Sequence, residues 1–455
     1  MKRNFMMFLD QWLNSSSRKP LIIRGARQVG KTWLVRDLAK RMDLQLIELN
    51  FEKKPQLASL FKENEPRIIL ENMELALGIV VDPKKTLLFL DEIQAAPQLI
   101  AKLRWFAEDL PELAVIAAGS LLEFALENHT FSMPVGRISL GYLEPLSFQE
   151  FLLAKGESQL AGYLRKYQIS SQIPLAIHEK LLSIFKEYFF VGGMPAAVNT
   201  WVETRSLIAL QQVQQELLTT YRDDFARYRG RLSIELLEEA MTAIPQQLGE
   251  KITYSKINPV VQSSAVKQAL ELLCKARVAH VVEGCGANGV PLAGDKNHKY
   301  KKMIFLDVGL SIGALGLRLS ELTSIEGITL VNRGGIAEQV VGQLLRTVEL
   351  AFMEPALYYW HREDKGGSAE VDYLLQHGSQ VIPVEVKAGA TGSLKSLHLL
   401  MGMKKLKRAV RINSDYPSAV EVNLKTTQGE TVSYHLLSLP FYLVEEIHRL
   451  IDQLP

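Results

Sequence analysis

Residues 21–32 read LIIRGARQVGKT, and the interpretation of the whole chain starts from them. The apolar residues 21–23 predict a strand, and a helical pattern begins at Trp33. Residues 25–32 between them match G-x-x-x-x-G-K-[ST] at every fixed position. Such a loop binds phosphate because its backbone N–H groups, together with a helix N-terminus, attract anions. The alternative is a chance Gly-rich turn, which the flanking strand and helix disfavour.

The loop supplies one set of predicted contacts to a nucleoside triphosphate. Lys31 would reach the β- and γ-phosphates, and the Thr32 hydroxyl would ligate Mg²⁺. The predicted nucleotide-binding residues of the loop are Gly25, Ala26, Arg27, Gln28, Val29, Gly30, Lys31 and Thr32. We therefore expect ATP and Mg²⁺ as cofactors.

Composition limits the class of protein. A length of 455 residues predicts two to four domains, and 47% hydrophobic with 22% charged residues is typical of globular proteins. A net charge of +2 does not indicate a particular binding partner. Cys274 and Cys285 are too few for a disulfide framework or a zinc site. Because no apolar run approaches a membrane span and residues 1–19 lack a signal-peptide core, we expect a cytoplasmic protein without membrane contact.

A second phosphate motif follows at residues 85–94, KTLLFLDEIQ. An apolar strand that ends in two acids suits phosphoryl transfer, which needs both a positioned water and neutralised charge. Asp91 would hold the Mg²⁺ shell, and Glu92 would orient and deprotonate the attacking water. Another predicted strand, residues 113–118, leads to Ser120, which would either sense the γ-phosphate or cap the following helix.

Arg137 lies in the segment MPVGRISLGYLEPLSFQEF, residues 133–151, on a predicted short strand. It would complete an ATP site within its own chain or, in a homo-oligomer, in a neighbouring chain. The alternative is a structural ion pair.

These motifs together give a specific resemblance. GARQVGKT, FLDEIQ, AAGS, VGRI and EPLSFQEF, in this order, resemble the bacterial and archaeal AAA+-like ATPases whose C-terminal half carries a DUF4143 domain. The resemblance extends over essentially the whole chain. It implies an N-terminal P-loop domain with a parallel sheet, and it places Arg137 on the Gly-Arg element of that family.

The middle of the chain predicts helices at residues 233–246, 253–259 and 263–276, then strands at 278–282 and 301–306 around a basic loop, 284–302. Three helices and a hairpin form a winged-helix pattern, and the resemblance points the same way. In DNA-binding versions the third helix enters the major groove. The side chains available for such contacts are Ser263, Ser264, Lys267, Gln268, His298, Lys299, Lys301 and Lys302. DNA contact, favoured over RNA, and a structural or protein-docking role remain equally open.

After Asn332 the predicted order is helix, strand, strand, strand, helix, strand. Glu385 and Lys387 lie two apart on one strand and so share a face, where Asp372 of the neighbouring strand can meet them. Converging carboxylates suit Mg²⁺, and the lysine would activate water or stabilise charge on a scissile phosphate. The pattern resembles the PD-(D/E)xK nuclease core, although Val371 stands where proline is usual. The predicted metal ligands are Glu338, Asp372 and Glu385, and Lys387 is the predicted catalytic residue.

We therefore predict an α/β multidomain protein. Its domains are a P-loop ATPase (1–152), a helical segment (153–230), a winged-helix-like domain (231–331) and an αβββαβ nuclease-like domain (332–455). The predicted function is ATP hydrolysis coupled to a Mg²⁺-dependent nuclease-like domain acting on DNA. The alternative is a nucleotide-switched binding or regulatory protein with an inactive nuclease fold.

Overall fold

The computed structural model describes residues 1–127, 134, 136–228, 230, 232–317, 333–364, 367–389, 393–425 and 431–455. The chain forms two compact units. The first, called the N-terminal unit, comprises Met1–Glu144, Lys275–Arg277 and Glu349–Glu354. The second, called the C-terminal unit, comprises Pro145–Cys274, Val278–Val348 and Pro355–Pro455. Within the described ranges, no helix is long and apolar enough to cross a membrane.

The N-terminal unit contains a parallel sheet, as the sequence predicts. Among its described residues the strand order is β2-β3-β4-β1-β5, and every neighbouring pair is parallel. The strands are β1 (Leu21–Arg24), β2 (Gln45–Asn50), β3 (Thr86–Asp91), β4 (Ala114–Ala118) and β5 (Ser139–Tyr142). The helices are α1 (Phe5–Leu13), α2 (Lys31–Arg41), α3 (Pro66–Leu77), α4 (Leu99–Asp109) and α5 (Leu122–Glu127), with the short 3₁₀ turns η1 (Pro55–Phe61) and η2 (Ile93–Ala95).

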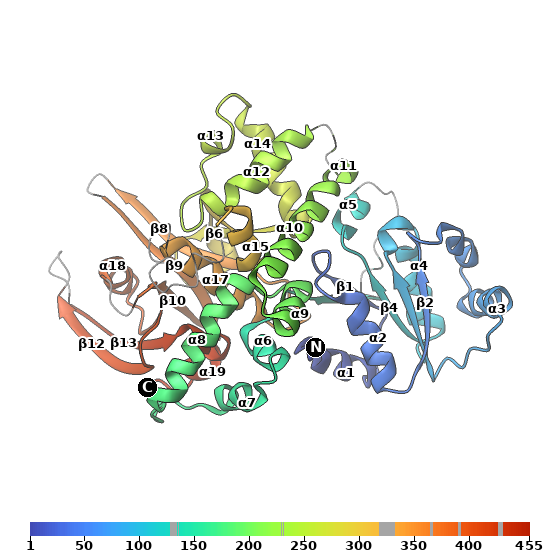
Figure 1. Cartoon of the computed structure of the whole chain (residues 1–455), viewed down its shortest axis with the longest axis horizontal. Coiled ribbons are helices and arrows are strands. Elements are labelled where there is room, and N and C mark those ends of the chain that lie inside the picture. The colour runs from blue at the N-terminus through green and yellow to red at the C-terminus, as the bar shows by residue number, and fades with distance from the viewer. Residues whose placement is uncertain are drawn as a thin grey trace. The chain divides into compact units, whose positions relative to one another are not determined.

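Helices flank this sheet (Figure 1, blue and cyan). On one face, Leu88 and Leu90 of β3 join a buried cluster with Met73 of α3 and Phe106 of α4. Helix α2 packs against β2, β3 and β4. A parallel strand covered on both faces is a nearly continuous apolar run, and β3, buried from end to end, has four apolar residues between Thr86 and Asp91. This explains why TLLFLD shows no alternation of polar and apolar residues.

The C-terminal unit begins with helices and ends with a sheet. Its helices are α6 (Phe148–Ala154), α7 (Ser158–Lys166), α8 (Leu175–Val191), α9 (Pro195–Thr204), α10 (Leu207–Asp223), α11 (Phe225–Tyr228), α12 (Ile234–Gln246), α13 (Tyr254–Ile257), α14 (Ser263–Lys275), α15 (Val308–Ala314), α17 (Arg333–Thr347), α18 (Lys395–Lys404) and α19 (Ile447–Ile451), with the 3₁₀ turns η3 (Leu292–Asp295) and η5 (Phe441–Glu446). Lys275, the last residue of α14, already belongs to the N-terminal unit.

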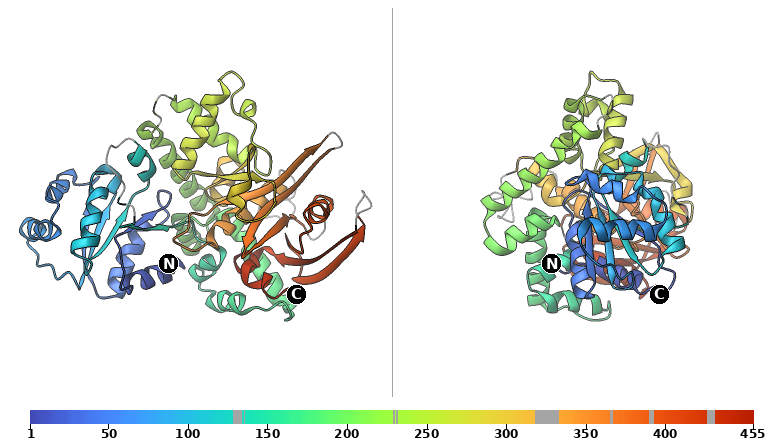
Figure 2. Two further views of the ribbon diagram at one scale, coloured as in Figure 1. Left: turned by 180° about the vertical axis from the view of Figure 1, so that it is seen from behind. Right: turned by 90° about the vertical axis from the view of Figure 1, so that its right-hand side faces the viewer.

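The sheet of this unit is mixed. In the described part its order is β12-β13-β11-β10-β9-β8-β6-β7. The strands are β6 (Ala279–Cys285), β7 (Lys296–Phe305), β8 (Leu357–Asp364), β9 (Gly367–His377), β10 (Gln380–Val386), β11 (Arg408–Asn413), β12 (Ser418–Lys425) and β13 (Thr431–Pro440). Seen from behind in Figure 2, they run from the yellow β6–β7 hairpin to the red β12–β13 hairpin.

The β6–β7 hairpin, predicted as the wing of a winged helix, is continuous with this sheet because β6 pairs in parallel with β8. The predicted basic loop at 284–302 is shorter than expected, since β7 already begins at Lys296. Its polar side chains favour a loop, but pairing with β6 satisfies the backbone groups and extends the strand. The winged-helix and nuclease-like interpretations, and the predicted domain boundaries, remain predictions.

Candidate functional site

The phosphate-binding loop connects β1 to α2, as the motif requires. Gly30 caps α2 with φ 100°, a left-handed conformation that favours glycine. At Gly25 a Cβ atom would lie 2.5 Å from the carbonyl oxygen of Leu143, so only glycine lets the loop approach that backbone. Both glycines of the motif therefore meet a steric need of this fold.

Lys31 is buried under the loop. Its Nζ donates hydrogen bonds to the carbonyl oxygens of Gly25 (3.0 Å) and Ala26 (2.8 Å). Burial lowers the pKa of Lys31 to about 8, although Glu92 and Asp91 partly oppose the shift. Neutral carbonyl groups are weaker partners for an ammonium than anions. A phosphate that reaches the loop can therefore compete for Lys31.

Asp91, at the end of β3, faces the same loop. Its Oδ2 accepts hydrogen bonds from the Thr32 hydroxyl and from the Asn50 amide, each at 3.2 Å. Burial, with the nearby charge of Glu92, raises the pKa of Asp91. The two predicted Mg²⁺ ligands, Thr32 at the start of α2 and Asp91 at the end of β3, are thus in direct contact. Hydroxyl and carboxylate oxygens are the donors that Mg²⁺ prefers, so this pair fits the ion.

Glu92 and Ser120 follow the ends of two adjacent strands. The parallel register pairs Asp91 with Ala118, which brings the carboxyl ends of β3 and β4 level. Glu92 has φ 51°, in the left-handed region, and its Oε2 accepts a hydrogen bond from the Gln94 amide at 2.5 Å. Strained backbone at a non-glycine residue is common at functional sites. Ser120 is buried two residues beyond β4.

Arg137 lies in an ion pair. Its Nε is 2.6 Å from Glu108 Oε1, which Arg104 also contacts at 3.1 Å. The hydrogen bond from Arg137 lowers the pKa of Glu108. This arrangement is the structural alternative that the sequence left open, and an action of Arg137 on nucleotide stays a prediction.

Arg277 is a buried charge of the N-terminal unit that sequence reasoning missed. Its guanidinium nitrogens lie 2.9 Å from Glu354 Oε1, 3.5 Å from Glu123 Oε1 and 3.9 Å from Glu144 Oε1. Burial opposes its charge, but these carboxylates raise the pKa of Arg277. Its positive charge contributes to the lowered pKa of Lys31, which places it near the phosphate loop. No local motif marks an arginine so far along the chain.

The second predicted site lies in the C-terminal unit, on β9 and β10. Val384 pairs with Tyr373 in the antiparallel register, so Asp372 and Glu385 end up on adjacent strands. Asp372 Oδ2 accepts a hydrogen bond from the Val386 amide at 2.7 Å, and Lys387 Nζ donates to Glu385 Oε1 at 2.6 Å. Burial, with the charge of Asp372, raises the pKa of Glu385 to about 7.

Glu338 of α17 also reaches this group. Burial and the charge of Asp372 raise the pKa of Glu338 well above its usual range. The structure thus brings together Glu338, Asp372, Glu385 and Lys387, as the sequence predicts.

Lys302 and Glu370 also belong to this group. The sequence predicted Lys302 as a possible DNA contact and assigned no role to Glu370. Lys302 Nζ lies 3.0 Å from Glu338 Oε2 and forms an ion pair with Glu370. We call Lys302, Glu338, Glu370, Asp372, Glu385 and Lys387 the charged cluster. In this arrangement the carboxylates do not fit a divalent ion, because an ammonium already lies among them. Consistently, the described residues contain no group of three or more His, Cys, Asp or Glu placed to hold a metal.

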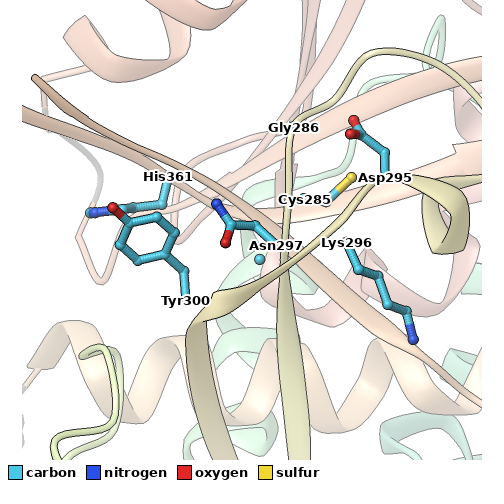
Figure 3. Close-up of a pocket in the computed structure, with 8 residues that line it drawn as sticks. Cys285, Gly286, Asp295, Lys296, Asn297, Tyr300 and His361 are labelled. Carbon is cyan, nitrogen blue, oxygen red and sulfur yellow. The ribbon is translucent and has the colours of Figure 1, made fainter.

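A pocket of about 300 Å³ opens beside the charged cluster, lined from β6, β7 and β8. Figure 3 shows the rings of Tyr300 and His361 side by side, and their centroids are 4.6 Å apart. His361 Nδ1 lies 3.4 Å from Glu370 Oε2. Glu370 therefore connects the pocket to Lys302.

Known domain families match three parts of the chain. Residues 17–152 match the family described as AAA domain, and residues 333–437 match a domain of unknown function, DUF4143. The chain therefore contains a P-loop AAA domain and a C-terminal DUF4143 domain. Residues 182–321 match another domain of unknown function, DUF8612. A search of curated proteins finds no relative of the chain.

Solved structures offer only distant similarity to this chain. The Walker-type ATPase PABY2304 of Pyrococcus abyssi is 15% identical, with 69% of this chain and 95% of that chain covered and a TM-score of 0.42. The ORC1 protein of Aeropyrum pernix in complex with DNA is 12% identical, with coverages of 70% and 92% and a TM-score of 0.27. DnaA from Aquifex aeolicus, bound to AMPPCP, is 14% identical, with coverages of 60% and 87% and a TM-score of 0.26. These similarities are too distant to carry any property over to this chain.

Proposed function

We propose that the N-terminal unit binds and hydrolyses ATP. The observation that carries the proposal is the contact of Thr32 with Asp91 beside Lys31, at the carboxyl edge of a parallel sheet. Lys31 and the loop N–H groups bind the phosphates, Thr32 and Asp91 would hold Mg²⁺, and Glu92 activates the water. Bound Mg²⁺ would supply charge neutralisation for the transferred phosphoryl group. Ser120 contacts the γ-phosphate or caps α5.

Calorimetric titration of the full chain with Mg²⁺-ATP, followed by a phosphate-release assay, tests this proposal. We expect one ATP bound per chain and release of phosphate above the background of ATP alone. Titration without heat and turnover at background would overturn it. A homo-oligomer in which Arg137 completes a neighbouring site predicts turnover per chain that rises with protein concentration.

We further propose that the nucleotide state controls a contact with nucleic acid, DNA rather than RNA. Support comes from α14, whose Ser263, Ser264, Lys267 and Gln268 are all exposed, as a groove-binding helix requires. Anisotropy of labelled duplex DNA and RNA, with and without ATP, tests the proposal. Lys267→Ala with Gln268→Ala should weaken DNA binding, and Lys256→Ala, on the exposed side of α13, is the matched control. Equal binding by wild type and the double variant would favour protein docking instead.

For the C-terminal cluster we favour a binding or regulatory role, because the Lys302 ammonium already lies in ion pairs with Glu338 and Glu370. The alternative is a Mg²⁺-dependent nuclease acting on DNA, in which Lys302 would have to leave Glu338 so that Glu338, Asp372 and Glu385 could hold the ion beside Lys387. Plasmid and oligonucleotide cleavage with Mg²⁺ or Mn²⁺, with and without ATP, separates the two. Cleavage that Asp372→Ala and Lys387→Ala both abolish would establish the nuclease. A wild-type protein that cuts neither DNA nor RNA would support the regulatory role.

A further inference from the structure

We propose that Lys302 takes the place of a divalent cation in the charged cluster and closes the cluster to metal. The inference deepens the proposed role of the C-terminal site. It is independent of ATP hydrolysis, because it concerns residues of the C-terminal unit alone.

The first observation is the position of the Lys302 ammonium. The side chain is 3% exposed, and its Nζ lies 3.0 Å from Glu338 Oε2 and in an ion pair with Glu370. The ring of Tyr359 covers it, with the centroid 5.2 Å from Nζ. Lys302 is therefore enclosed by anionic and aromatic partners on several sides, as a bound cation would be.

The second observation is the set of charges around Lys302. Burial disfavours the charged form of Lys302, yet Glu338, Glu370 and Asp372 together raise its pKa well above the usual range. The ion pairs with Glu338 and Glu370 hold this positive charge in place. A divalent ion at the same place would have to displace a fixed positive charge or lie next to it, and both cost free energy at such short range.

The second lysine of the cluster has a different place. Lys387 Nζ contacts Glu385 Oε1 at 2.6 Å, and its side chain is 24% exposed. It lies at the edge of the cluster and can turn towards solvent. We therefore attribute the exclusion of metal from the charged cluster to Lys302 and not to Lys387.

Backbone pairing holds Lys302 in the cluster. In β7 it pairs with Val282 of β6, and its backbone also forms a bridge with Lys251. Gln339 of α17, next to Glu338, accepts a hydrogen bond from the Phe305 amide at 2.7 Å and donates one to the Phe305 carbonyl at 2.8 Å. The strand that carries Lys302 is thus tied to the helix that carries Glu338. Moving the backbone of Lys302 away from the cluster would break this strand pairing.

Replacement of Lys302 by methionine tests the proposal, since methionine keeps the length of the side chain and removes its charge. Without nucleotide, Lys302→Met should melt at a lower temperature than wild type, and millimolar Mn²⁺ should restore several degrees because a ligand that binds only the folded state stabilises it. Electron paramagnetic resonance should count one more bound Mn²⁺ per chain than in wild type. Adding Asp372→Asn should remove that ion.

Lys301→Met is the matched control. Lys301 is the adjacent residue of β7, pairs with Glu283 of β6 at 3.5 Å and lies outside the cluster. This variant should bind no more Mn²⁺ than wild type. Lys302→Arg, which keeps the charge, should behave in the same way.

Wild-type protein decides the question even if Lys302→Met does not fold. The proposal is overturned if wild type binds Mn²⁺ at submillimolar concentration and Asp372→Asn abolishes that binding. It is also overturned if folded Lys302→Met gains no ion over Lys301→Met. Neither outcome bears on ATP hydrolysis, which the phosphate-release assay reports separately.

Discussion

Two buried lysines, Lys31 of the N-terminal unit and Lys302 of the C-terminal unit, have different partners and opposite pKa shifts. Lys31 donates to two backbone carbonyl groups, and burial lowers its pKa to about 8. Lys302 contacts the carboxylates of Glu338 and Glu370, and its pKa is raised. A lysine held by neutral dipoles can exchange them for phosphate. A lysine held by carboxylates already has its counter-ions.

The difference suggests that burial of charge does not by itself mark a ligand site. At the phosphate loop the carbonyl partners of Lys31 carry no negative charge, and glycines keep the backbone accessible to an anion. In the charged cluster the compensation comes from the chain.

Lys31→Ala should reduce ATP binding at least a hundredfold, because it removes the cation under the loop, whereas Lys302→Met should leave ATP binding unchanged. Calorimetric titration measures both. Lys40→Ala, on the exposed face of α2, is the control and should bind like wild type. Equal losses in the Lys31 and Lys302 variants would break the contrast between the two lysines.

Glu92→Gln should bind ATP with wild-type affinity and lose about a hundredfold to ten-thousandfold in turnover, the range of a removed general base. The amide keeps the shape of the side chain but cannot accept the proton of water. Phosphate release under saturating ATP is the measurement. Wild-type turnover in this variant would show that another group activates the water.

Arg277→Met tests a buried cation of the N-terminal unit that, like Lys302, is held by carboxylates. We expect a loss of about 3 kcal/mol in the free energy of unfolding, since Glu123 and Glu144, which are 21% and 9% exposed, lose their counter-ion. Denaturant titration measures the loss. Arg36→Met is the matched control, because the Arg36–Glu48 pair is exposed and such pairs contribute less than about 1 kcal/mol. Equal losses of unfolding free energy in Arg277→Met and Arg36→Met would show that the ion pairs of Arg277 stabilise the fold no more than an exposed pair does.

The affinity for ATP should be constant below about pH 8 and fall by up to about tenfold per pH unit above it. Phosphate raises the pKa of Lys31 in the complex, so binding above the free pKa of about 8 takes up a proton and weakens as pH rises. Titrations between pH 7 and 9 measure the slope. Lys31→Arg, if it binds ATP, should show no such slope, and a flat profile in wild type would contradict the assigned pKa.

Much of the nucleotide site could be predicted because its signals are local. A strand, a glycine-rich loop and a helix follow one another in residues 21–41, and Asp91 directly ends an apolar strand. Since parallel strands of one sheet end at a common edge, the order of these segments is enough to bring Thr32 and Asp91 together. The set Glu338, Asp372, Glu385 and Lys387 was predictable for a similar reason, from strand alternation and element order.

The sequence by itself determined the phosphate loop, the acids that face it and the acids on β9 and β10. Only the tertiary structure decided that Arg277 belongs to the nucleotide-binding unit and that Lys302 lies among those acids. In the sequence Lys302 is one more basic residue where the predicted loop meets the predicted strand, since Lys299 and Lys301 come just before it. Its role depends on the pairing of β6 with β8, and those strands are about seventy residues apart. Contacts between segments so distant leave no periodicity or spacing in the chain, so folding alone assigns the lysine its partners.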